Sequence, residues 1–512
     1  MSDPDRSPTL GSPPKGIPVE LMDFAALPGF QPLLIRGPPG AGKTTLALTL
    51  AEAWSGPVVF VSTRVSRDEM LQEFPHLRFL GGREITIIDG REHEITMEQS
   101  ERALSGLGAA LLTDPGQGAV RDFLYLPGPL QETMSRLVPG HRTMVIVDSW
   151  EPMLDAFLAP IRGPERPPVT RAEVERLLLS MFARENIVLC LLLERPDPSP
   201  LDYLVNGVVV ADREDQEGEL VRWMHFPKFR NVAIRHDRYP FSLYGKRAAA
   251  IVTYRPAGRI DQIRPDPEPS PEPGWLWPGT QSFASAFGRL PFGKFSLLEA
   301  DDDVPEEIVS SLLDPMMLHT MLNGGRVAYV PFPLRSPAEV WAAHHPYFRA
   351  GDYVHRMRIL RSVVNPNHVG DIVEAVAVLG PSPTDLSPRD AVRRVLDFVV
   401  QKEASAHPSL GVLSTIALES IVRQGGMDSL TSTTLATALQ DAIEDLRVHV
   451  VMSRRSSSKS PFGEQLGLSA AMYLRLVYKH GRLFLRGVRP YTGYFYLKPR
   501  EGDLAIEFVP VV

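Results

Sequence analysis

Cysteine, long apolar segments and excess positive charge are all scarce in this sequence. Its 512 residues include one cysteine, Cys190, so no disulfide can form within the chain and a reducing compartment, the cytoplasm, is expected. No apolar run approaches the length of a membrane span, and the polar, proline-rich residues 1–15 do not resemble a signal peptide. Lysine and arginine number 54 against 61 acidic residues, a net charge of −7, which argues against gripping nucleic acid through overall charge.

One short segment carries the pattern of a phosphate-binding loop. From Pro32 to Ala51 the sequence is PLLIRGPPGAGKTTLALTLA, which fits G-x-x-x-x-G-K-[ST] with a strand pattern before it and a helical pattern after it. Glycines let successive backbone N–H groups point inward, and the positive end of the helix dipole adds to the attraction for phosphate. We therefore predict that ATP binds through Gly37, Pro38, Pro39, Gly40, Ala41, Gly42, Lys43, Thr44 and Thr45.

The side chains around this loop suggest specific roles. Lys43 is expected to contact the β- and γ-phosphates, and the Thr44 hydroxyl to bind Mg²⁺. The apolar segment RTMVIVD ends in Asp148, and a carboxylate at the carboxyl end of a parallel strand would lie beside the loop, on the magnesium side. A second strand pattern, NIVLCLLLE, contains Cys190 as an expected core residue and ends in Glu194. The candidate catalytic residues are Lys43, Asp148 and Glu194.

The order of these motifs resembles that of the RecA-like ATPases of the KaiC type. From Gly16 to near Thr253, the loop and the Asp148 strand are followed by NGVVVAD and then by KFRNVAIRHDRYPFSL, similar to a family segment with the approximate pattern K-x-R-G-x-x-H. The resemblance implies a RecA-like fold. It also implies that Lys228 and Arg230 reach the nucleotide site of a neighbouring subunit; the alternative is that they are two solvated charges on a strand.

The chain departs from this family where catalytic glutamates are expected. KaiC-like enzymes place one or two glutamates just after the strand that follows the loop helix, where a carboxylate can orient the attacking water. Here the sequence is FVSTRVSRDEM, with Arg64 and Val65 at those positions. Asp68, Glu69 and Glu194 are candidates for a replacement base, and the sequence does not choose among them. We therefore expect ATP binding with slow or conditional hydrolysis.

The second half of the chain repeats the layout of the first. Residues 258–277 are rich in proline and acids and are predicted to form a semi-extended linker, after which strand, loop, helix and strand patterns recur in the same order. An unrelated α/β domain is the alternative. We predict an α/β protein with tandem RecA-like P-loop NTPase domains, the second degenerate. The predicted parts are a disordered arm at 1–15, an ATP-binding domain at 16–257, the linker at 258–277 and a domain without a phosphate loop at 278–512.

The second copy has lost the residues that would hold phosphate. The segment EADDDVPEE, Glu299 to Glu307, stands where the first copy has GPPGAGKTT, and it contains no glycine, no lysine and six acidic side chains. These charges would repel a triphosphate. We predict that this half binds no nucleotide, and that Asp301–Asp303 cap the helix that follows.

Length, the phosphate loop and the STRVS turn also make the chain look like the archaeal family of KaiC-related proteins that includes the gas vesicle regulator GvpD. That resemblance implies an ATP-binding regulator, with a protein partner or a homo-oligomer receiving its nucleotide state. A recombinase paralogue that binds single-stranded DNA and a structural protein stabilised by ATP are the alternatives. Nucleic acid is possible but not favoured, although one strand pattern interleaves residues able to stack on bases: Arg489, Tyr491, Tyr494 and Tyr496.

Overall fold

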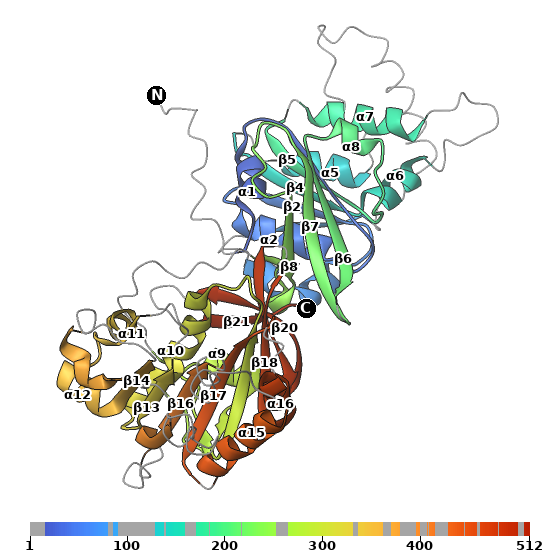
Figure 1. The fold of residues 1–512 in the computed structure, drawn as a ribbon. Coiled ribbons are helices and arrows are strands. Elements are labelled where there is room, and N and C mark those ends of the chain that lie inside the picture. The colour runs from blue at the N-terminus through green and yellow to red at the C-terminus, as the bar shows by residue number, and fades with distance from the viewer. Residues whose placement is uncertain are drawn as a thin grey trace. The chain divides into compact units, whose positions relative to one another are not determined.

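The computed structural model consists of helices and strands in two α/β units (Figure 1). The predicted arm at residues 1–15 lies outside the described residues. The structure describes residues 16–79, 85–90, 128–137, 140–158, 170–183, 185–216, 218–251, 265–330, 336–361, 370–378, 396–399, 407, 409–414, 429–444, 446–457, 461–479, 481–499 and 506–512.

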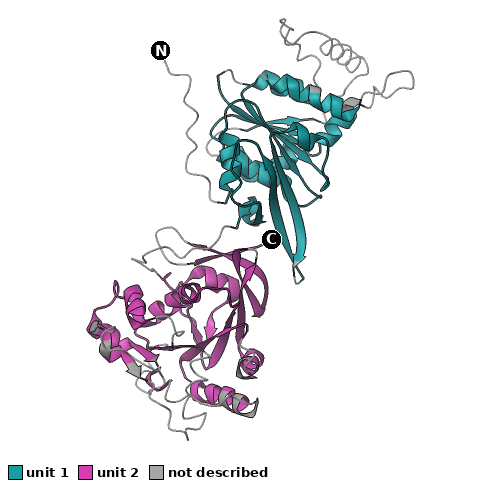
Figure 2. Cartoon of the chain, turned by 45° about the horizontal axis from the view of Figure 1, so that its top comes forward, with its two compact units in different colours: residues 1–252, 511–512 teal, residues 253–510 magenta. Residues whose placement is uncertain are grey.

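Unit 1 comprises residues 1–252 with 511–512, and unit 2 comprises residues 253–510 (Figure 2). The division lies near residue 257, where the sequence predicts the end of the first domain. In the described parts of both units, no helix combines the length and the apolar character needed to cross a membrane.

Unit 1 contains a mixed sheet whose described strands are β1 (Gln31–Arg36), β2 (Val58–Ser62), β3 (Thr86–Asp89), β4 (Thr143–Asp148), β5 (Ile187–Leu193), β6 (Gly207–Gln216), β7 (Glu219–Phe229), β8 (Arg238–Ser242) and β9 (Ala249–Ala250). Their order is β3-β2-β4-β5-β1-β6-β7-β8-β9. Neighbours from β3 to β6 are parallel, and the last three strands are antiparallel. Strands β1 and β5 are buried along their whole length, as expected for continuous apolar runs covered on both faces.

Helices cover both faces of this sheet. Alternate side chains of β1 enter different cores: Leu33 and Ile35 pack with α1 and α2, whereas Leu34 packs with α5, α6 and α7. Cys190 in β5 is fully buried, which raises the pKa of its thiol to about 12 and confirms it as a core residue. The described helices are α1 (Val19–Ala26), α2 (Lys43–Ala53), α3 (Arg67–Glu73), α5 (Gly128–Arg136), α6 (Trp150–Leu158), α7 (Arg171–Phe182) and α8 (Leu201–Leu204).

Unit 2 contains a second mixed sheet, built from β12 (Lys294–Ala300), β13 (Val327–Val330), β14 (Met357–Arg361), β15 (Val376–Val378), β16 (Ser409–Ser414), β17 (Val448–Arg455), β18 (Met472–Lys479), β19 (Arg482–Arg489), β20 (Tyr491–Pro499) and β21 (Ile506–Pro510). Its described helices are α9 (Gln281–Phe287), α10 (Glu306–Leu322), α11 (Pro337–His344), α12 (Ala350–Arg356), α15 (Ser429–Ile443) and α16 (Pro461–Ser469). Alternate residues of β12 again enter separate cores: Leu298 packs with α10, and Leu297 with α15 and α16.

The two sheets have the same topology. The order in unit 2 is β15-β14-β13-β16-β17-β12-β18-β19-β20-β21, so each strand of unit 1 has a counterpart in the same place, and β15 is added at one edge. Strand β12 corresponds to β1 because each lies in the centre, between two parallel neighbours. The predicted fold class, an α/β protein of tandem RecA-like units, is confirmed.

The predicted linker at residues 258–277 is wrong over its described part, residues 265–277. Strand β10 (Trp275–Leu276) pairs with β11 (Leu290–Pro291), and the side chain of Trp277 is 2% exposed, with its indole donating to the Asp266 carbonyl at 3.0 Å. Glu268 forms an ion pair with Arg289 at 2.6 Å. Proline and acid content suggested an unfolded segment, but its apolar end and a basic partner fold it onto unit 2.

Candidate functional site

The loop between β1 and α2 depends on glycines at two places. A side chain at Gly37 would place its Cβ 1.9 Å from the carbonyl oxygen of Ala211 in β6, so a larger residue would displace the backbone. Gly42 precedes the first turn of α2 with a φ of +92°, a left-handed conformation that glycine adopts without strain. The strand, loop and helix predicted from the sequence are therefore present in that order.

Lys43, the first residue of α2, turns its side chain back onto the loop. Its ammonium donates to the carbonyl oxygens of Gly37 at 3.0 Å and Pro38 at 2.9 Å, and the residue is 5% exposed. Burial lowers the pKa of Lys43, while the carboxylates of Glu194 and Asp148 oppose that shift. A largely buried ammonium on two neutral carbonyls is a strong attractor for an anion.

Thr44 and Asp148 meet beside this lysine. The Thr44 hydroxyl donates to the Asp148 carboxylate at 2.6 Å, which joins the start of α2 to the end of β4. Burial raises the pKa of Asp148, opposed by the Thr44 hydrogen bond and by the charges of Arg64 and Lys43. A hydroxyl and a carboxylate oxygen at this spacing are ligands of the kind that Mg²⁺ uses together with phosphate.

These groups surround a hollow of about 280 Å³ at the carboxyl end of the central strands. It is the place where open α/β sheets bind their ligands. Of the predicted loop residues, Gly37 and Pro38 contact Lys43, Pro39 is exposed and Ala41 is buried. The hollow is lined by Gly40, Gly42, Lys43, Thr44, Thr45, Ser62, Arg64, Val65, Met70, Glu73, Phe74, Asp148, Glu194 and Leu243.

The structure separates the three candidates for a water-activating carboxylate. Glu69 caps its own helix, α3, by accepting the amide of Ser66 at 2.7 Å, and Asp68 is exposed and does not line the hollow. Glu194 does line it, and forms an ion pair with Arg64. The hollow therefore contains a carboxylate, that of Glu194, but the guanidinium of Arg64 is paired with it.

Lys228 and Arg230 do not line this hollow. Lys228 donates to the carbonyl of Asp202 at 2.8 Å, and Arg230 to the Asn206 side chain at 3.3 Å. In the sheet, Lys228 lies opposite Val208 of β6. Val208 in turn pairs with Leu34 of β1, two residues before that strand ends and the loop begins. The structure places both residues away from the loop of their own unit, so their action on a neighbouring subunit stays a prediction.

Sequence reasoning missed a pair of arginines beside the loop. Arg213 of β6 lies directly opposite Arg222 of β7, and its guanidinium is 3.3 Å from where a Cβ at Gly40 would be. Burial, and then the charge of Arg213, lower the pKa of Arg222. Like charges in direct cross-strand register repel each other, so this flank favours an anion. Only the hairpin register reveals the pair, since the two arginines are nine positions apart in the sequence.

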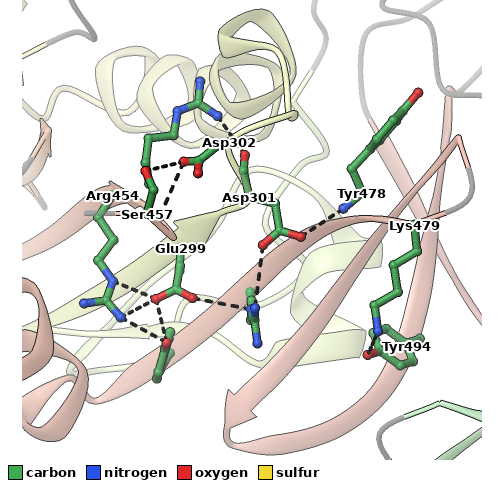
Figure 3. Close-up of polar contacts among 11 residues, drawn as sticks. Glu299, Asp301, Asp302, Arg454, Ser457, Tyr478, Lys479 and Tyr494 are labelled. Carbon is green, nitrogen blue, oxygen red and sulfur yellow. Dashed lines mark hydrogen bonds and ion pairs between the residues drawn. The ribbon is translucent and has the colours of Figure 1, made fainter. Parts of the chain in front are cut away.

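The corresponding place in unit 2 is filled by the chain's own charges (Figure 3). Glu299, near the end of β12, is 6% exposed and accepts the Tyr473 hydroxyl at 2.8 Å. It also forms ion pairs with Arg454 of β17 and, at 3.4 Å, with Arg475 of β18. Burial, and then Glu299, raise the pKa of Tyr473.

The loop after β12 is held by a guanidinium. Arg455 donates to the carbonyls of Asp301 at 3.1 Å and Val304 at 2.5 Å, much as Lys43 does in unit 1, although it comes from a neighbouring strand. The predicted capping of α10 by Asp301–Asp303 is wrong: its N-cap is Pro305, with no side-chain cap. Asp302 instead accepts the Ser457 hydroxyl at 2.7 Å, because the short loop directs it toward the end of β17 (Figure 3).

The aromatic residues proposed to stack on bases are mostly core residues. Tyr494 and Tyr496 are 3% and 6% exposed, whereas Tyr491 is 71% exposed. Arg489 donates to the carbonyls of Leu468 and Ala470, at 3.0 and 2.9 Å. The alternation on β20 therefore follows the inside and outside of the sheet.

Fold and site together define an α/β protein of two RecA-like units, the first with a phosphate-loop sequence in strand–loop–helix geometry and the second without one. No protein-family model matches the chain. The chain is 28% identical over 251 residues to Protein GvpD1 of Halobacterium salinarum. This match covers 46% of the chain and 42% of the relative, so it spans less than half of the curated protein. The comparison supports a GvpD-like relationship.

The Glu299 cluster of unit 2 generates a stability prediction. In Glu299→Gln, Arg454 loses its charged partner while 12% exposed, so the free energy of unfolding of unit 2 should fall by about 3 kcal/mol. Glu507→Gln removes an acid of the same unit from an exposed pair with Lys498 and should cost less than about 1 kcal/mol. Urea unfolding, followed by hydrogen exchange of β12 and β17 peptides, compares the two variants. Equal losses would contradict a structural role for the cluster.

Proposed function

We propose that unit 1 binds ATP with Mg²⁺ and that the chain is a GvpD-like regulatory protein. Its nucleotide state would be passed to a protein partner or to a homo-oligomer. One observation carries this proposal: the largely buried ammonium of Lys43 rests on two neutral carbonyls of its own loop, beside the Thr44–Asp148 pair. Phosphate oxygens are stronger partners for that ammonium than peptide carbonyls.

The residues present suit this ligand. The amides of the loop and of the first turn of α2 would bind phosphate, Lys43 would neutralise it, and Thr44 and Asp148 would hold Mg²⁺. The metal would supply charge neutralisation at the phosphates. Arg213 adds positive charge next to Gly40, and Arg222 lies opposite Arg213 in the neighbouring strand.

The positions and partners of the acidic residues near the hollow support slow or conditional hydrolysis. Glu194 is the proposed base, since Glu69 is engaged as a helix cap and Asp68 is outside the hollow. The ion pair with Arg64 occupies Glu194, so its carboxylate is not available to a water molecule in this arrangement. A protein that retains its nucleotide for long periods is suited to signalling.

We propose a regulatory role because unit 1 keeps a phosphate-loop sequence, whereas unit 2 has internal ion pairs and hydrogen bonds at the corresponding place. Unit 2 retains the sheet topology of unit 1 while its loop is bound by Arg455 and Glu299 is neutralised internally. Such a unit would serve as a partner-binding or assembly surface. The similarity to GvpD1 supports a GvpD-like regulatory protein.

Replacing Lys43 tests the binding site. Lys43→Ala should weaken Mg–ATP binding by a factor of about ten to a hundred or more, because a charge-assisted contact to phosphate is lost. Lys294→Ala, an exposed lysine at the start of β12, serves as the control and should bind as the wild type does. Isothermal titration calorimetry measures both affinities. Unchanged binding by Lys43→Ala would refute the proposed site.

Turnover by the purified chain alone should be slow. We expect phosphate release on the order of less than 1 per second, below the usual enzyme range, because Arg64 and Val65 stand where KaiC-like enzymes place their catalytic glutamates. A phosphate-release assay with saturating ATP measures it, with Lys43→Ala as the background. Rates of about 1 per second or more that disappear in Glu194→Gln would show that Glu194 acts as an efficient base despite its ion pair.

A further inference from the structure

Arg64 lines the hollow but does not belong to the phosphate loop. It follows β2, and β2 is separated from β1 by β4 and β5 in the sheet. Its side chain is 45% exposed and reaches Glu194, just after the end of β5. Both residues line the same hollow as Lys43 and Asp148.

The charge of Arg64 acts within the site. Burial lowers the pKa of Lys43 and raises that of Asp148, the two groups on which phosphate and magnesium binding are proposed to depend; the charge of Arg64 adds to the first shift and opposes the second. Glu194 acts on the same two groups with the opposite sign. Arg64 and Glu194 therefore form an ion pair inside the hollow.

Arg64 can exchange its partner Glu194 for another anion at a small cost in free energy. An ion pair between partly exposed side chains contributes little to stability, and the exposed fractions here are 45% for Arg64 and 24% for Glu194. A guanidinium has five N–H donors in a planar fork and binds phosphate in a bidentate manner. Phosphate is therefore a competitive replacement for the Glu194 carboxylate.

Position decides which phosphate this would be. The loop and the start of α2 hold the phosphates nearest to them, and the Arg64 guanidinium, paired with Glu194 just after β5, faces the same hollow from outside the loop and is left for the end of the phosphate chain. A diphosphate lacks that end group. We propose that Arg64 binds the terminal phosphate and so makes unit 1 selective for nucleoside triphosphate over diphosphate, an inference that rests on the proposed nucleotide-binding function.

The exchange also connects nucleotide state to the protein. When Arg64 turns to the terminal phosphate, Glu194 loses its cation at the end of β5. The same movement exposes the candidate base only when a triphosphate is present. Arg64 is thus a specificity-determining residue, and it positions Glu194 by releasing it.

Comparing two ligands in the full chain tests the proposal. The dissociation constants of Mg–ADP and of the non-hydrolysable analogue Mg–adenylyl imidodiphosphate are measured by calorimetry for wild type and Arg64→Gln. We expect the preference for the triphosphate analogue to fall about tenfold in Arg64→Gln, with ADP affinity changed less than about threefold. Arg78→Gln removes an exposed arginine outside the hollow and should leave the preference unchanged.

A double-mutant cycle separates this role from general electrostatics. Glu194→Gln removes the competitor for Arg64 and should raise the triphosphate preference, and this gain should disappear in the Arg64→Gln background. A preference that is unchanged in Arg64→Gln, or an equal loss of both ligands, would overturn the inference while leaving nucleotide binding intact. If the wild type binds neither ligand, the proposed function itself fails.

Discussion

The burial of the Lys43 ammonium beside the turn after β1 is the constraint on which the first unit depends. A cation withdrawn from water needs acceptors, and the carbonyls of Gly37 and Pro38 supply them. They face the ammonium because the chain turns at glycines, and Gly37 must remain glycine because Ala211 leaves no space for a side chain. The shape of the loop, the packing of β1 against β6 and the position of the Lys43 charge therefore depend on one another.

The two units have the same sheet topology but opposite electrostatic arrangements. In unit 1, charged side chains line an open hollow, and among them Arg64 and Glu194 form an ion pair that we propose a ligand replaces. In unit 2, Glu299 is buried among basic and hydroxyl groups, and Arg455 holds the loop carbonyls. In the proposed function, unit 1 responds to an anion, while unit 2 is stabilised without one.

The sequence predicts those features that depend on local pattern. The loop glycines, the strand that ends in Asp148 and the repeated order of elements follow from spacing and from apolar runs. The pairing of Arg64 with Glu194 could not be predicted, because it joins segments separated by 130 positions through the order of the strands. The prediction that Asp301–Asp303 cap a helix is wrong for a related reason: Ser457, in the turn after β17, donates its hydroxyl to Asp302.

We propose that the chain has one working nucleotide site, in unit 1, and a counterpart in unit 2 that is closed by its own ion pairs. Calorimetric titration of the full chain with ATP in the presence of Mg²⁺ tests this arrangement. One nucleotide per chain is the expected stoichiometry. Two nucleotides per chain would show that unit 2 also binds, and no saturable binding would contradict the account as a whole.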